Sequence, residues 1–172
     1  MKDAILGAAI EVVALHGLNN WTVEEVANRA RCAKGLVNYH YRSKQDLLVQ
    51  VAETIRDDRA AHRLAAVQSS GAPALDRLWE TLIREMESGW FAAWLSLLAA
   101  DGPLRTAASS TPKSPRTFAL ALGRALDIGD HLVPRATLIE ATLDGLQLGL
   151  LQGAPLAATE EDFHRFWLTI LP

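Results

Sequence analysis

The chain has few of the features that mark secreted, membrane-spanning or disulfide-stabilised proteins. Cys32 is the one cysteine among 172 residues, so no internal disulfide can form and a reducing cytoplasm is the expected compartment. No uninterrupted apolar run approaches the roughly 20 residues that a membrane-spanning helix needs, so no membrane partner is expected. Asp3 and Glu11 interrupt the apolar start of the chain and no small-residue cleavage pattern follows, so a secretion signal is not predicted.

Residues arranged for catalysis or metal binding are also lacking. The scattered histidines have no metal-ligand spacing with one another or with the cysteine, so no metal and no cofactor are expected. They are His16, His62, His131 and His164. No nucleophile lies beside a base, and Glu140 and Asp144, which share a helix face, are interpreted as a solvated or interface stripe. The sequence does not predict an enzyme.

Basic residues, by contrast, are concentrated in one short stretch. The formal net charge is -3, yet the run from Asn28 to Gln45 contains no acidic residue. Phosphates are contacted within a Debye length of about 8 Å, so the local charge matters more than the total. Solvation of a helical surface is the alternative, but the run coincides with the turn described next, and we predict nucleic acid as the partner. The basic residues are Arg29, Arg31, Lys34, Arg42 and Lys44.

The same stretch predicts two short helices joined by a tight turn. Thr22 and Glu25 form the pairing that caps a helix start, and an apolar face follows it. Residues 31–33 separate this helix from a second segment, Lys34 to Tyr41. Ser43 and Asp46 then open a long helix that runs past Arg63. This order is a helix-turn-helix.

Three sequence segments resemble the DNA-binding region of the TetR family of bacterial transcriptional regulators: ILGAAIEVVALHGLNNWTVEEVANRA, AKGLVNYHY and SKQDLL. The resemblance implies an all-α homodimer with a helix-turn-helix domain over residues 1–46 and a larger effector-binding and dimerisation domain over residues 47–172. Arg31 stands where the family often has glycine, and Ala33 where a serine or threonine often caps the recognition helix. Loss of that cap typically costs about 1 kcal/mol.

The resemblance also implies which residues meet double-stranded DNA. Lys34, Gly35 and Leu36 would start the recognition helix in the major groove, where lysine can donate to guanine and leucine can touch a thymine methyl group. The next turn would hold phosphates or a neighbouring base, and two helix starts would favour phosphate. Structural roles as caps or packing residues are the alternative for several of these. The full predicted set is Thr22, Arg31, Ala33, Lys34, Gly35, Leu36, Asn38, Tyr39, His40 and Lys44.

Beyond a break at residues 68–73, aromatic residues gather in two adjacent predicted helices. Small-molecule sites are concave and mostly apolar, so these residues suggest a pocket for a small apolar or aromatic effector. Filling of the domain core is the competing interpretation. The candidates are Trp79, Met86, Trp90, Phe91 and Trp94. Residues 102–116 are expected to be mostly irregular, and a helix is expected from about Pro115 to Leu126.

The last two predicted helices carry apolar stripes and small residues. Thr159 with Asp162 is expected to cap the final helix. The resemblance implies a four-helix bundle between two copies, although packing within one monomer is the alternative. The predicted interface is Ile139, Leu143, Gly145, Leu146, Gly149, Phe163, Phe166, Trp167 and Ile170. Two recognition helices would then face half-sites about 34–36 Å apart.

These observations predict a cytoplasmic, sequence-specific DNA-binding regulator. We expect a repressor that a small molecule releases from a palindromic operator. A DNA-binding regulator that is controlled by a protein partner, or that has no ligand, is the alternative.

Overall fold

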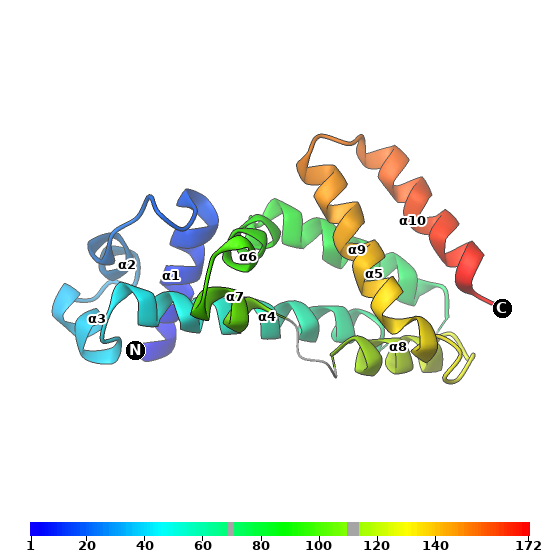
Figure 1. Ribbon diagram of the computed structural model, residues 1–172, viewed down its shortest axis with the longest axis horizontal. Helices are drawn as coiled ribbons and strands as arrows, with labels where there is room; N and C mark the ends of the chain where they lie inside the picture. The colour runs from blue at the N-terminus through cyan, green and yellow to red at the C-terminus, as the bar shows by residue number, and fades with distance from the viewer. Residues whose placement is uncertain (69–70, 110–113) are drawn as a thin grey trace. The chain divides into compact units, whose positions relative to one another are not determined.

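The computed structural model describes residues 1–68, 71–109 and 114–172, and this part of the chain is helical without a β-strand (Figure 1). The predicted all-α fold is therefore confirmed. No helix within these residues is long and apolar enough to cross a membrane. The helices are α1 (Lys2–His16), α2 (Val23–Arg29), α3 (Lys34–His40), α4 (Lys44–Ala66), α5 (Pro73–Glu87), α6 (Trp90–Ala99), α7 (Pro103–Ala108), α8 (Ser114–Ala125), the 3-10 turn η1 (Val133–Arg135), α9 (Ala136–Leu151) and α10 (Leu156–Ile170).

The chain forms two compact units. The amino-terminal unit comprises Met1–Asp58 and Ser88–Ser109, and the carboxy-terminal unit comprises Arg59–Glu87 and Ser110–Pro172. Helix α4 therefore contributes residues to both. The predicted functional division at residue 46 stays a prediction, because compactness does not say which residues bind DNA or an effector.

The amino-terminal unit is built around α1. Ile5 and Val13 of this helix are fully buried, as are Val26 of α2 and Val51 of α4. Gly89, just before α6, has φ 77, and a Cβ there would lie 3.0 Å from the carbonyl oxygen of Ala14. Glycine therefore allows the start of α6 to approach the end of α1 closely.

Helix α7 corrects the expectation that residues 102–116 are mostly irregular. Pro103 occupies its first turn, where the missing N–H has no helical partner to lose. Leu104, Ala107 and Ala108 are buried, which explains why the segment folds as a helix. Arg56 Nη1 donates to the carbonyl of Ala107 at 2.8 Å. The helix predicted from about Pro115 is confirmed as α8, and residues 110–113 lie outside the described residues.

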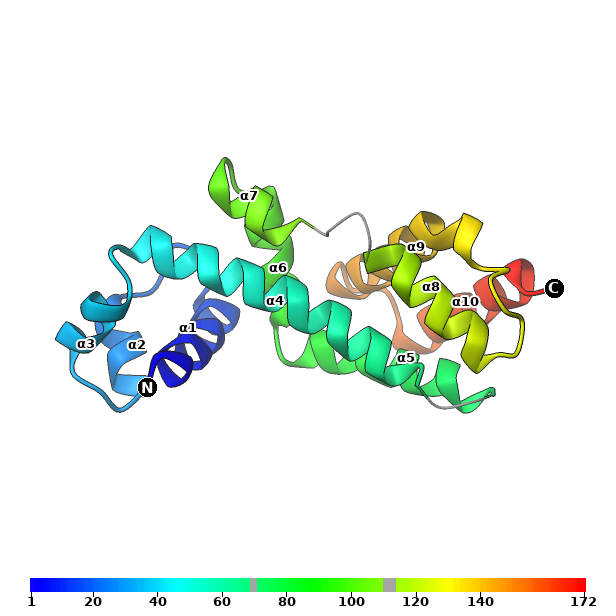
Figure 2. The same ribbon diagram turned by 90° about the horizontal axis from the view of Figure 1, so that it is seen from below.

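The carboxy-terminal unit has a large apolar core. Helix α9 packs against α5, α8 and α10 (Figure 2). The rings of Trp79 and Phe163 lie 5.1 Å apart, and those of Phe163 and Trp167 5.9 Å apart. The core is mainly Leu78, Leu82, Leu122, Leu132, Ile139, Leu143, Phe163 and Trp167.

The start of α10 differs from the prediction. The helix begins at Leu156 after Pro155, so Thr159 lies inside its first turns and is not the cap. Thr159 is buried, and its Oγ1 donates to the carbonyl of Pro155 at 3.0 Å. A threonine hydroxyl can donate its hydrogen bond to the carbonyl four residues earlier, so Thr159 can be buried within a helix.

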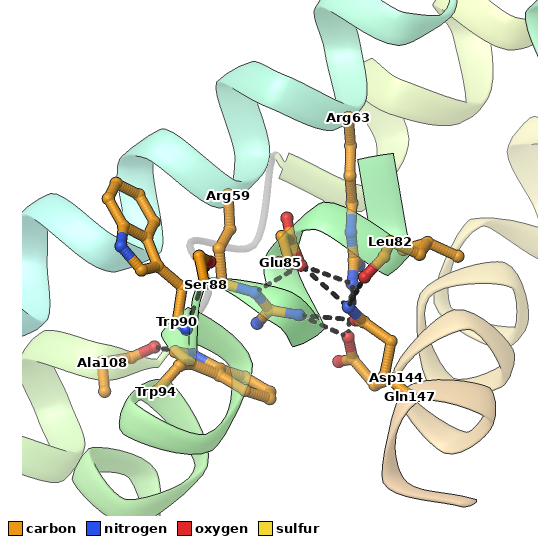
Figure 3. Close-up of polar contacts among 10 residues, drawn as sticks. All are labelled: Arg59, Arg63, Leu82, Glu85, Ser88, Trp90, Trp94, Ala108, Asp144 and Gln147. Atoms are coloured by element: carbon orange, nitrogen blue, oxygen red, sulfur yellow. Dashed lines mark hydrogen bonds and ion pairs between the residues drawn. The ribbon is translucent and has the colours of Figure 1, made fainter. Parts of the chain in front are cut away.

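A network of polar side chains is buried in the carboxy-terminal unit (Figure 3). Arg59 and Arg63 of α4 both donate to Asp144 Oδ1, at 3.0 and 2.7 Å. Arg59 Nε also donates to Glu85 Oε2 of α5 at 3.1 Å. Both arginines and Glu85 are at most 6 % exposed. Charges at this depth are stable only when they are paired.

Gln147 of α9 connects the members of this network. Its Oε1 accepts hydrogen bonds from both arginines, at 3.2 and 2.9 Å, and its Nε2 donates to Leu82 O and to Glu85 Oε2. Glu140 lies one turn before Asp144, and burial raises the pKa of its carboxyl while Arg63 opposes the shift. The network thus links α4, α5 and α9 by directed contacts within the apolar core.

The network predicts an unequal cost for removing two glutamates. Glu85→Ala deprives buried Arg59 of a carboxylate, so we expect the free energy of unfolding to fall by about 3–5 kcal/mol. Glu161→Ala removes an exposed carboxylate of α10, so we expect the free energy of unfolding to change by less than about 0.5 kcal/mol. Chemical denaturation of both variants measures the difference. Similar small losses would show that the network does not hold the unit together.

Candidate DNA-binding surface

Helix α2 begins with the predicted capping pair. Thr22 Oγ1 accepts from the backbone N–H of Glu25 at 3.1 Å, and Glu25 Oε2 accepts from the backbone N–H of Thr22 at 2.6 Å. The hydrogen bond from that backbone N–H holds the pKa of Glu25 below its usual value. Val26 and Ala27 are buried on the inner side of the helix. The prediction of a capped first helix is confirmed.

The turn between α2 and α3 is closed by backbone hydrogen bonds. Arg31 has φ 53, the left-handed conformation that glycine adopts most easily. The N–H of Cys32 donates to the carbonyl of Ala27 at 2.9 Å. Ala33 makes no side-chain hydrogen bond to the start of α3, so the missing hydroxyl cap expected from the sequence is confirmed.

Helix α3 has one buried and one exposed side. Val37 is 1 % exposed, and Tyr41, which follows the helix, is 3 % exposed. The other side carries Lys34, Gly35, Asn38 and Tyr39, all of them exposed, and Tyr39 is the extreme at 81 %. Leu36 and His40 are half-buried. Lys34 and Asn38 lie one helical turn apart, as do Gly35 and Tyr39, so the exposed side forms a row along the helix.

The start of α4 is fixed to the start of α2. Lys44 Nζ donates to the carbonyl of Trp21 at 2.7 Å and lies 4.1 Å from the centroid of the Trp21 ring. Ser43 Oγ accepts from the N–H of Asp46 at 3.0 Å, so the second predicted capping pair is also present. These contacts hold the end of the recognition segment against the first helix of the motif.

The residues predicted to bind an effector lie in both units. Trp79 and Met86 belong to the carboxy-terminal unit, and the other three belong to the amino-terminal unit. The rings of Phe91 and Trp94 lie 5.7 Å apart, and Trp94 Nε1 donates to the carbonyl of Ala108 at 3.0 Å. These contacts fit the packing alternative, and the effector role stays a prediction.

Five residues of the predicted dimer interface lie in the core of the carboxy-terminal unit instead. They are Ile139, Leu143, Phe163, Trp167 and Ile170. Their apolar stripes are covered by the unit itself, as the alternative interpretation proposed. Gly145 is exposed, and Leu146, Gly149 and Phe166 are partly exposed. Sequence reasoning missed exposed Leu138, Leu148 and Leu168, although the first two recur at helical spacing with Ala141 and Gly145.

Comparisons with known proteins agree with this geometry. Residues 5–51 match the profile described as bacterial regulatory proteins, tetR family. A structure from Rhodococcus sp., described as a TetR-family transcriptional regulator, is 22% identical, covers 99% of this chain and 98% of its own, and has a TM-score of 0.77. A transcriptional regulator from Rhodococcus sp. RHA1 is 26% identical over 99% of this chain and 96% of its own, with a TM-score of 0.74.

A third solved structure is described as a transcriptional regulator from Saccharomonospora viridis in complex with choline. It is 18% identical, covers 96% of this chain and 94% of its own, and has a TM-score of 0.69. The comparison with curated proteins gave no match. The match over residues 5–51 shows that the amino-terminal region is that of the tetR family of bacterial regulatory proteins, and the solved structures share the fold along the chain.

Proposed function

We propose that this regulator acts as a homodimeric repressor that binds a palindromic operator and is released by a small molecule. The observation that carries the proposal is the exposed row of side chains on α3, opposite buried Val37. A short helix that is anchored on one side and polar on the other suits insertion into the major groove.

Lys34 is the proposed base-reading residue. Its Nζ lies 3.8 Å from Glu24 Oε2, and both side chains are more than half exposed. Such a surface pair contributes little, so the ammonium can exchange the carboxylate for guanine O6 or N7. Gly35 allows the backbone to approach the DNA closely, and Leu36 would meet a thymine methyl group.

Other residues of the surface are proposed to hold the DNA backbone. Thr22 and Lys44 lie at helix starts, and Asn38, Tyr39 and His40 lie in the second half of α3. Lys44 uses one of its three N–H donors on Trp21, which leaves two for a phosphate. These contacts position the protein without selecting a sequence.

The exposed side of α9 is proposed as the dimer interface. Leu138, Ala141, Gly145 and Leu148 follow one another at three- and four-residue spacing and are all exposed. Small residues between leucines let two helices approach closely. Leu168 of α10 is 82 % exposed and would extend the same contact.

The proposed effector acts by shifting populations. A ligand that binds the DNA-incompetent form more tightly must weaken DNA binding by the same factor. The structure that resembles this chain and contains choline makes a quaternary ammonium compound one class to test, because such cations bind aromatic faces. The burial of Trp79, Phe91 and Trp94 supports a second candidate, a DNA-binding regulator without a small ligand.

Selection of bound sequences from random duplex DNA tests the function directly. We expect a palindrome with half-sites about 34–36 Å apart, bound at least about a thousandfold more tightly than a scrambled duplex. The selected duplex then serves to screen choline and aromatic compounds for release. Weak, salt-sensitive binding without enrichment of any sequence would contradict the proposal.

Lys34 and Lys44 should affect DNA binding in different ways. Lys34→Ala removes a base contact, so preference at one operator position should fall by about 1–3 kcal/mol. Lys44→Ala removes a phosphate contact, so binding to operator and scrambled duplex should weaken alike and the salt slope should fall by about 1. Because Lys44→Ala also removes the hydrogen bond to Trp21, thermal melting of this variant measures whether the domain is destabilised. Equal effects of both variants on both duplexes would refute this division of roles.

The proposed interface predicts the outcome of two matched substitutions. Leu148→Glu puts a charge on the exposed side of α9, where a partner helix would bury it without a counter-charge. Leu15→Glu makes the same change at an exposed leucine of α1. In sedimentation velocity, the wild type and Leu15→Glu should be dimers and Leu148→Glu a monomer. A dimer in all three cases would place the interface elsewhere.

A further inference from the structure

The five basic residues of the acid-free run differ in what they already contact. Arg29 Nε lies 3.4 Å from Glu11 Oε2, and Lys34 Nζ lies 3.8 Å from Glu24 Oε2. Lys44 Nζ is bonded to the carbonyl of Trp21. Three of the five cations therefore have an acceptor within the protein before any DNA arrives.

Arg31 and Arg42 are the other two. Both are exposed, and no ion pair or hydrogen bond involves either guanidinium among residues 1–68, 71–109 and 114–172. Only the backbone N–H of Arg42 is engaged, by Asp46 Oδ2 at 3.1 Å. A guanidinium presents five N–H donors in a planar fork that matches two phosphate oxygens. These two side chains are thus the ones that can bind an anion without breaking an internal contact.

The two arginines lie at opposite ends of α3. Arg31 precedes the helix by three residues and Arg42 follows it by two. A helix of seven residues is about 10 Å long, and the major groove is about 12 Å wide. Side chains that flank such a helix at both ends can reach the sugar–phosphate strands on the two sides of the groove.

We infer that Arg31 and Arg42 bind one DNA phosphate each, on opposite sides of the major groove, and so set how α3 lies within it. The inference rests on the proposed DNA-binding surface and adds Arg42 to it. Both are positioning residues, because phosphate contacts orient a protein without reading the base sequence.

The backbone of Arg31 gives an independent test of its role. At φ 53 a residue with a Cβ is less stable than glycine, and among the described residues no ion pair or hydrogen bond of the Arg31 guanidinium offsets this. If position 31 served only the fold, glycine there would give a more stable protein than arginine. If arginine serves to bind phosphate, Arg31→Gly should stabilise the protein and weaken DNA binding at the same time.

The experiment measures binding to a labelled duplex of mixed sequence between about 50 and 200 mM salt. Arg31→Gly and Arg42→Gln should each lower the slope of log affinity against log salt by about 0.9, and the double variant by about twice that. Arg31→Lys should retain the wild-type slope. Arg124→Gln, at an exposed arginine of α8, is the charge-matched control and should leave the slope unchanged. In thermal melting, Arg31→Gly should raise the unfolding midpoint by a few degrees.

The outcomes separate this inference from the proposed function. If the wild type binds with a steep salt slope that Arg31→Gly and Arg42→Gln leave intact, the two arginines do not hold phosphates although the protein binds DNA. A fall of the same size in Arg124→Gln would show an effect of net charge only and overturn the assignment. If the wild type binds neither this duplex nor any selected one, the DNA-binding proposal fails, and the inference fails with it.

Discussion

Two arginines of α4 have to be paired wherever the carboxy-terminal unit is folded, because an unpaired buried charge costs several kcal/mol. The partners that satisfy Arg59 and Arg63 come from α5 and α9, and Gln147 bonds to both arginines and to Glu85. Apolar side chains tolerate small sliding between helices, whereas these hydrogen bonds form in one alignment only. We interpret the network as the constraint that fixes the relative register of α4, α5 and α9.

In the amino-terminal unit, local contacts have the corresponding role. Capping at Thr22 and Ser43, a closed turn at Arg31 and the bond from Lys44 to Trp21 join helices that are too short to be stable alone. Burial of Val37 then decides which side of α3 is exposed. The geometry of the helix-turn-helix thus follows from a few local interactions within residues 21–46, together with the one longer bond from Lys44 to Trp21.

That difference explains what the sequence could predict. Thr22, Glu25, Ser43 and Asp46 act on neighbours in the chain, so their pattern indicated the motif and its boundaries. The role of Thr159 depended on where α10 begins, and α7 formed because Leu104 found a buried position, which only the tertiary structure decides. The same holds for α9, which is apolar on two sides: Leu143 faces the core and Leu148 faces outward, and the sequence does not say which stripe is covered.

The bond between Lys44 and Trp21 has a consequence for how such a regulator can be switched. It spans the whole motif, because Trp21 precedes α2 and Lys44 follows α3. The bond thus ties the residue before α2 to the start of α4, across both short helices. Under the proposed dimeric function, regulation would then alter the distance and angle between two intact helix-turn-helix motifs, and each motif alone would keep its affinity for half an operator.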